Sequence, residues 1–208
     1  MLEVTEIFHS LQGEGPFSGQ PAVFLRLSGC IEPLCPWCDT MYACGTGYSM
    51  SWDAVYDRIA SFETQLVVIT GGEPFLQWHA GLKQLEKRLL GQEYRVQYET
   101  SGKIAIPGDA KGFAVCSPKF LDNRWVFDEI NLMRAQVFKF VVDNDFDIIK
   151  EFIQEHNISP EQVFMMPKGI SREEQLNKFQ DIWSFCVENG FHFSPRLHVL
   201  TFNNKRGV

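Results

Sequence analysis

Three cysteines lie within nine residues, in the segment GCIEPLCPWCDT. Cys30, Cys35 and Cys38 share a loop with two prolines, so one metal group could bind all three thiols. Isolated cysteines are usually small buried apolar residues. That explanation suits Cys116, in a strand-like stretch, and Cys186, in a helix-like one, but it does not suit three cysteines in one loop. The spacing therefore indicates a metal or iron–sulfur site.

Three kinds of metal site remain open for this loop. A structural zinc site needs four ligands, and Cys44 could be the fourth, although no second cysteine pair or nearby histidine follows. A plant-type [2Fe–2S] cluster also begins C-x4-C-x2-C, and its fourth ligand would be Cys44 or Cys116. A [4Fe–4S] cluster on three thiolates would leave one iron open to a ligand from outside the protein. An open coordination position distinguishes reactive metal sites from structural ones.

Composition and charge restrict the class of protein. The chain has 208 residues, of which 45% are hydrophobic and 22% charged, and this length suits a single domain spanning 1–208. A formal net charge of −7 argues against nucleic acid as a partner, because proteins that follow phosphate backbones are usually basic. We see no signal peptide and no apolar run of the roughly 18 residues that a membrane span needs. We therefore expect a cytoplasmic protein with reduced thiols and no membrane contact.

Strand-like and helix-like stretches alternate along the chain, which predicts an α/β fold with a mainly parallel sheet. Helical spacing of apolar residues marks the helices, and short apolar runs rich in β-branched and aromatic residues mark the strands. The last stretch, 191–202, is expected to form one or two strands. The other expected strands are 21–27, 65–70, 95–100, 112–117, 136–142 and 163–167, and the expected helices are 51–62, 77–90, 145–156 and 171–189, the last closed by Gly190.

Polar and glycine-rich segments follow these strands. They read GC, TGGEP, ETSG, SPK and MPKG in chain order. Because sites in parallel α/β sheets collect at the carboxyl ends of strands, we expect all five segments to meet at one site.

The cysteine loop resembles the signature of radical S-adenosylmethionine (SAM) enzymes. That signature is usually C-x3-C-x-aromatic-C, and Trp37 stands at the aromatic position. The chain departs from it by one residue, since four residues separate Cys30 from Cys35. The segment VITGGEP, 68–74, is similar to the GGE motif of the same enzymes. The resemblance favours a [4Fe–4S] cluster whose open iron binds SAM.

A narrower resemblance covers nearly the whole chain. The segments LQGEGPFSGQPAVFLRLSGC, CDT, VITGGEP, ETSG, SPK and PRLHVL are similar to the 7-carboxy-7-deazaguanine synthase family. This resemblance implies a partial, shortened TIM-like barrel and a homodimer. It implies conversion of 6-carboxy-5,6,7,8-tetrahydropterin to 7-carboxy-7-deazaguanine and ammonia, in queuosine and deazapurine biosynthesis. The implied cofactors are a [4Fe–4S] cluster, SAM and Mg²⁺, and the implied partners are the pterin and a low-potential electron donor such as flavodoxin or ferredoxin.

The same resemblance assigns residues to the cofactors. Cys30, Cys35 and Cys38 would bind the cluster, and Thr40 would bind Mg²⁺, although its hydroxyl could instead cap a turn. Met166 would contact SAM through its backbone only. The full set expected at SAM is Gly71, Gly72, Glu73, Ser117, Pro118, Lys119, Met166, Pro167, Lys168 and Gly169.

Arg26 is the candidate ligand for the carboxylate of the substrate. It interrupts the apolar strand AVFLRL, where an unpaired charge is costly, and a guanidinium can bind a carboxylate through two hydrogen bonds. A buried salt bridge is the alternative. His198 is expected to contact the substrate or transfer a proton, unless it is a core histidine. No catalytic role is expected for His9, His79, His156 or His192. By resemblance the other substrate residues are Leu11, Gln12, Gly13, Glu14 and Thr70.

Two other functions remain as alternatives. A radical-SAM activating enzyme, which places a glycyl radical on a partner protein, would share the cysteine loop and GGEP but lack the LQGEG and CDT segments. An electron-transfer iron–sulfur protein would need a fourth cluster ligand and would not cleave SAM.

Overall fold

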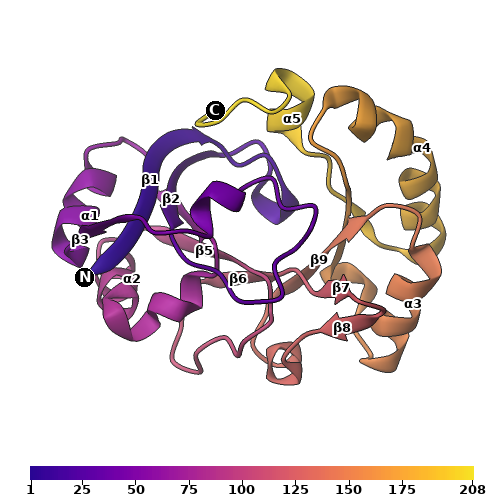
Figure 1. Cartoon of the computed structure of the whole chain (residues 1–208), viewed down its shortest axis with the longest axis horizontal. Coiled ribbons are helices and arrows are strands. Elements are labelled where there is room, and N and C mark those ends of the chain that lie inside the picture. Colours follow the sequence, from indigo (N-terminus) through magenta and orange to yellow (C-terminus); the bar gives the residue numbers. More distant parts are fainter.

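One curved sheet with helices along its outer side forms the frame of the protein. The computed structural model describes all residues, 1–208. Helices α1 and α2 lie at one end of the sheet and α3 and α4 at the other (Figure 1). The strands are β1 Leu2–Leu11, β2 Pro21–Leu27, β3 Tyr48–Met50, β4 Leu66–Gly71, β5 Arg95–Thr100, β6 Phe113–Cys116, β7 Lys119–Leu121, β8 Arg124–Val126, β9 Val137–Val142, β10 Val163–Pro167 and β11 His192–Phe193. The α-helices are α1 Trp52–Ala60, α2 Leu82–Leu90, α3 Phe146–Glu155, α4 Arg172–Asn189 and α5 Leu197–Phe202.

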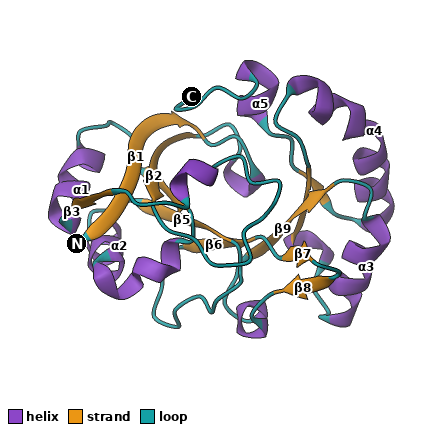
Figure 2. Cartoon of the chain, viewed as in Figure 1, coloured by secondary structure: helices purple, strands orange, loops and turns teal.

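The sheet has the strand order β11-β10-β9-β6-β5-β4-β2-β1-β3. From β2 to β11 every neighbouring pair is parallel, whereas β1 runs antiparallel to both β2 and β3. The strands form an open curved band (Figure 2). The predicted α/β fold with a partial barrel of mainly parallel strands is therefore confirmed.

The parallel strands are apolar because both of their faces are covered. In β4, Leu66 to Ile69 are all buried. The helices pack their apolar stripes on the outer side of the sheet, as Val55 and Ile59 of α1 and Leu82 of α2 illustrate. Together 31 buried residues form one main core cluster, which fixes the sheet and leaves its carboxyl edge free to carry loops.

Helix α4 begins and ends as its sequence predicts. The Ser171 side chain accepts a hydrogen bond from the Glu174 backbone, and the Glu174 side chain accepts one from the Ser171 backbone, so the two form a capping box. Gly190 ends the helix in the left-handed region, with φ of 71°.

The structure differs from the sequence-based prediction at several places. Strands β1 and β3 and the β7–β8 hairpin were not predicted. The helix expected over 77–90 is broken, because Gly81 has φ of 141° and separates a 3-10 segment, Pro74–Ala80, from α2. The expectation of strands over 191–202 is wrong beyond Phe193, since Leu197–Phe202 form helix α5.

None of the helices combines the length and the apolar character that crossing a membrane requires.

Candidate active site

A cavity of about 310 Å³ lies where the loops that follow the parallel strands converge. It brings together residues from the start, the middle and the end of the chain, as the parallel sheet predicts. Two expected site residues, Glu73 and Pro118, do not line it, and neither does any histidine other than His198. The expected site residues that line the cavity are Leu11, Gln12, Gly13, Glu14, Arg26, Cys30, Cys35, Cys38, Thr40, Thr70, Gly71, Gly72, Ser117, Lys119, Met166, Pro167, Lys168, Gly169 and His198.

The cysteine loop is held from two sides. The backbone N–H of Gly29 donates to the Ala43 carbonyl over 2.8 Å, and this bond closes the base of the loop. The Lys103 ammonium donates to the Ile31 carbonyl over 3.3 Å and also to the Pro33 carbonyl. These bonds satisfy backbone carbonyls within the four residues that separate Cys30 from Cys35.

The Gly-Gly-Glu segment after β4 packs directly against this loop. The Gly72 N–H donates to Leu27 over 3.1 Å, and the Glu73 N–H donates to the Gly29 carbonyl over 2.7 Å. A Cβ atom on Gly72 would lie 1.7 Å from the Gly29 carbonyl oxygen. Glycine is required here because two backbones touch, so the contact fixes Gly72 and the cysteine loop relative to each other.

Glu73 is fully buried beneath the cavity. Its carboxylate accepts hydrogen bonds from the Thr100 hydroxyl over 2.8 Å, from the Ser101 hydroxyl over 2.6 Å and from the Ser101 backbone over 3.0 Å. Burial raises the pKa of this carboxyl, although the same hydrogen bonds act in the opposite direction. Glu73 therefore fixes the ETSG loop, and in this structure it is not exposed to a ligand in the cavity.

The thiols of Cys30, Cys35 and Cys38 line one shared space. No group of three His, Cys, Asp or Glu side chains is placed to hold one metal ion. In a [4Fe–4S] cluster each thiolate binds a different iron, so thiols that line one space could hold such a cluster. Thiolate is also the ligand such clusters take. Cys44 lines the cavity as well, and burial, together with its neighbours Cys30 and Cys38, raises its pKa to about 12.

Arg26 reaches the cavity with one of its three nitrogens already paired. Its Nε donates to the Glu6 carboxylate over 2.6 Å, and the Tyr42 hydroxyl donates to the same oxygen over 3.0 Å. The rings of Phe8 and Tyr42 each lie 5.9 Å from the guanidinium carbon. The alternative of a buried salt bridge is thus present, but Nη1 and Nη2 make no hydrogen bond within the protein and remain available to an anion.

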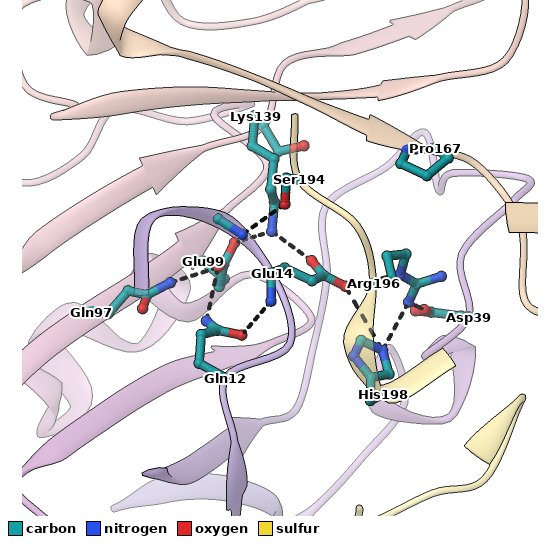
Figure 3. Close-up of polar contacts among 12 residues, drawn as sticks. Gln12, Glu14, Asp39, Gln97, Glu99, Lys139, Pro167, Ser194, Arg196 and His198 are labelled. Carbon is teal, nitrogen blue, oxygen red and sulfur yellow. Dashed lines mark hydrogen bonds and ion pairs between the residues drawn. The ribbon is translucent and has the colours of Figure 1, made fainter. Parts of the chain in front are cut away.

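Glu14 and Glu99 share one buried lysine. The Lys139 ammonium, 4% exposed, lies 2.7 Å from Glu14 Oε2 and 2.8 Å from Glu99 Oε2 (Figure 3). Burial raises the pKa of Glu99, whereas the pKa of Glu14 is lowered although burial acts against this, because Lys139 and Arg196 both face it. Glu14 is therefore the more acidic of the two carboxyls in this pocket.

Arg196 continues the chain of charges on the other side of Glu14. Its Nε donates to Glu14 Oε1 over 2.9 Å, and its Nη2 pairs with Asp39 (Figure 3). His198 Nε2 lies 3.4 Å from Arg196 Nη2 and 3.8 Å from Glu14 Oε1. Burial lowers the pKa of His198, and the Arg196 charge acts in the same direction, so the ring is neutral at pH 7. Gly13 packs against this ring, because a Cβ there would lie 2.3 Å from His198 Nδ1.

Thr40 lies beside Cys38, the third cysteine of the loop. Its hydroxyl is 3.5 Å from the Cys38 sulfur. Thr40 precedes the 3-10 segment Met41–Ala43, but its side chain makes no capping hydrogen bond there. The hydroxyl thus shares a hydrogen bond with the Cys38 sulfur and caps no backbone group, and Thr40 lines the cavity.

Sequence reasoning missed several residues of this site. Lys139 interrupts the apolar strand VFKFVV as Arg26 interrupts AVFLRL, so the same argument could have identified it. Asp39 and Arg196 lie within the CDT and PRLHVL segments, where no role was assigned to them. Nothing in the sequence indicated that the segment 203–208 would line the cavity, where the Arg206 guanidinium lies 4.0 Å from the Tyr42 ring.

No family model matches the chain. Among curated proteins, it is 37% identical to a 7-carboxy-7-deazaguanine synthase of Hyperthermus butylicus, over 96% of this chain and 92% of the relative. It is 38% identical to one of Pyrobaculum aerophilum, over 99% of this chain and 97% of the relative. Among solved structures, it matches QueE from Escherichia coli with a TM-score of 0.80 and 25% identity, over 95% of this chain and 94% of that one. A likeness to Streptococcus suis SuiB, with a TM-score of 0.55 and 12% identity, concerns the fold alone.

Proposed function

The chain belongs to the 7-carboxy-7-deazaguanine synthase family of radical SAM lyases, and we propose from this membership and from its cavity how it carries out the family's reaction. The reaction converts 6-carboxy-5,6,7,8-tetrahydropterin to 7-carboxy-7-deazaguanine and releases ammonia, for queuosine and deazapurine biosynthesis. One observation supports the assignment of its parts most strongly. Three cysteines of one loop share a single cavity with an arginine and an ionised glutamate suited to a carboxylated pterin.

Cys30, Cys35 and Cys38 would hold a [4Fe–4S] cluster with one iron left for SAM. When bound, the cluster and SAM supply the electron and the 5′-deoxyadenosyl radical with which the reaction begins. The backbone of Gly72 is close to that of Cys30, and Gly71 and Gly72 would bind the methionine end of SAM. The other residues in reach of SAM are Ser117, Lys119, Met166, Pro167, Lys168 and Gly169. Glu73 and Pro118 do not line the cavity, so they would support the loops that bind SAM and would not contact SAM themselves.

The substrate would lie between Arg26 and Glu14. The free Nη1 and Nη2 of Arg26 match the two oxygens of a carboxylate. Each oxygen of Glu14 already accepts from a cation, yet a carboxylate has about four lone-pair positions, so it can still accept the N–H donors of the pterin. Backbone groups of 11–13 and the Thr70 side chain would border the ring.

His198 would act as a neutral imidazole. Because its Nε2 lies within hydrogen-bond distance of the Arg196 guanidinium, Nε2 accepts and Nδ1 carries the proton. In this form His198 orients the substrate and takes up a proton only when Arg196 is displaced from Nε2.

Thr40 would give a hydroxyl to Mg²⁺, which prefers oxygen ligands and keeps several waters.

Three further properties belong to this proposal. The protein would act as one domain over 1–208, as a homodimer and in the cytoplasm. Its electron would come from a low-potential donor such as flavodoxin or ferredoxin. Neither nucleic acid nor a membrane is needed for the reaction.

Anaerobic reconstitution with iron and sulfide tests the proposal. The protein is then supplied with SAM, Mg²⁺, a reductant and 6-carboxytetrahydropterin, and the product is identified by mass and ultraviolet absorbance. We expect 7-carboxy-7-deazaguanine and ammonia in equal amounts. SAM cleavage without pterin consumption would contradict the proposed substrate, and the absence of SAM cleavage would favour an electron-transfer protein.

A further inference from the structure

The Arg196 side chain lies at the rim of the cavity and makes polar contacts with several other segments of the chain. The residue is 8% exposed, and its guanidinium makes four polar contacts within the protein. Nε donates to Glu14, Nη1 donates to the Gly169 carbonyl over 2.7 Å, and Nη2 pairs with Asp39. Figure 3 shows Glu14, Asp39 and His198 grouped around Arg196.

These contacts join segments that are far apart in the sequence. Glu14 lies 182 positions from Arg196 and belongs to the loop after β1. Asp39 lies 157 positions away, between the cluster cysteine Cys38 and the proposed metal ligand Thr40. Gly169 lies in the loop between β10 and α4. One side chain thus connects the loops proposed to hold the substrate, the metal and SAM.

Only an arginine can make this set of contacts. The guanidinium is a planar fork with five N–H donors, whereas an ammonium has three donors at one point. Its charge is buried but lies between two carboxylates, whose contacts raise the pKa of Arg196 against the effect of burial. With four contacts already made inside the protein, little of the fork is left for a ligand.

We propose that Arg196 is a positioning residue that sets Glu14 against the pterin. This role rests on the proposed function of Glu14 as the residue that accepts from the pterin. It predicts that Arg196 affects pterin binding through Glu14 and leaves the cluster and SAM binding unaffected, because the Gly169 carbonyl also accepts a hydrogen bond from Gln175 over 3.0 Å.

A double-mutant cycle with Glu14 tests this. Arg196→Gln, Glu14→Gln and the double variant are reconstituted, and KM for the pterin, kcat, iron content and SAM binding are measured for each. Arg134→Gln is the matched control, because Arg134 also donates to a backbone carbonyl, that of Ile106 over 2.6 Å, but lies away from the cavity.

We expect Arg196→Gln to raise KM about tenfold, the scale of one charge-assisted hydrogen bond. Iron content and SAM binding should match the wild type, and the double variant should be no worse than Glu14→Gln alone, since Arg196 acts through Glu14. Arg196→Lys, which keeps the charge but not the fork, should recover part of the loss. Arg134→Gln should leave KM unchanged.

Three outcomes would overturn the inference. An unchanged KM in Arg196→Gln would show that Glu14 does not depend on Arg196 for its position. A KM in the double variant that rises by the product of the two single effects would show that Arg196 acts independently of Glu14. Loss of iron or of folding in Arg196→Gln, with wild-type KM in Arg196→Lys, would reduce Arg196 to a structural residue. The wild-type protein is measured in the same assay. If it forms no product, the proposed reaction is refuted; if it forms product, the results for the variants test the role of Arg196 alone.

Discussion

Replacing Arg26 by lysine tests how the cavity recognises a carboxylate. In the structure Arg26 Nε is occupied by Glu6 at 2.6 Å, which leaves Nη1 and Nη2 for the substrate. Lysine keeps the charge but offers a single point in place of the fork, so one of the two hydrogen bonds is lost. A hydrogen bond to a charged group contributes about 1.5–3 kcal/mol, which corresponds to a rise of about 10- to 150-fold in KM for the pterin.

The assay separates binding of the substrate from the state of the cluster. KM and kcat are measured with saturating SAM, and SAM cleavage is measured separately without pterin, which should proceed as in the wild type. Glu6→Gln should raise KM by less than Arg26→Lys, because it weakens only the orientation of the guanidinium. Arg58→Lys is the control, since Arg58 is exposed and stacks on Phe62 outside the cavity. An unchanged KM in Arg26→Lys would refute the reasoning, and so would unfolding of both Arg26→Lys and Glu6→Gln, which would make the ion pair structural.

Four other predictions concern the cluster, the metal and pH. Gly72→Ala should lower iron content and stability, because its Cβ would overlap the Gly29 carbonyl, whereas Gly45→Ala, with open space around it, should have no effect on either. Cys44→Ala should keep the iron content of the wild type, whereas replacing Cys30, Cys35 or Cys38 should abolish it, as measured by an iron assay after reconstitution. Thr40→Val should keep the cluster and SAM binding but lose the response of turnover to added Mg²⁺. Because the pKa of His198 is lowered in the folded protein, the free energy of unfolding should fall as the pH drops below about 6.5, and by less in His198→Gln.

Each of these predictions has a result that contradicts it. Full iron content in Gly72→Ala would show that the loop can move away from β4 without loss. Iron loss in Cys44→Ala would favour a zinc or ferredoxin-type site. Wild-type turnover after removal of all divalent metal would exclude the metal role of Thr40. An identical pH dependence of unfolding for wild type and His198→Gln would place the sensitive group elsewhere.

The parallel part of the fold could be predicted because its signals are local. The strands β2, β4, β6, β9 and β10 are mainly apolar runs followed by glycine or polar residues, and the alternation of such runs with helices predicts a parallel sheet. Helix α4 carries both of its end signals in the sequence. The cysteine loop and the Gly-Gly-Glu segment were likewise visible, since each follows a predicted strand.

The remaining errors come from contacts between distant segments. The segment 197–202 has β-branched and aromatic residues typical of a strand, yet it forms a helix whose first N–H, that of Leu197, donates to Gly13 over 3.0 Å. Strand β1 has mostly half-buried positions, which gives little apolar signal. The partner of Arg26 could not be deduced either, because Glu6 and Arg26 are brought together only by the antiparallel pairing of β1 with β2.

The buried charges show the same limit. That Lys139 needs a partner follows from its place in an apolar strand. That the partners are Glu14 and Glu99, 125 and 40 positions away, follows only from the curvature of the sheet. The sequence therefore predicts which residues belong to the site better than it predicts how they pair.

The central claim is that one cavity binds SAM and the pterin side by side. The most direct test is the transfer of a labelled hydrogen from the pterin to the 5′-deoxyadenosyl group of SAM. 6-Carboxytetrahydropterin carrying deuterium at C6 is given to the reconstituted protein with SAM, Mg²⁺ and a reductant, and the 5′-deoxyadenosine formed is examined by mass spectrometry. We predict that the 5′-deoxyadenosine carries deuterium and that its amount does not exceed that of the 7-carboxy-7-deazaguanine, because the pterin and its two products have the same elemental composition and no hydrogen is lost overall. Unlabelled 5′-deoxyadenosine, formed at the same rate with and without the pterin, would contradict the account.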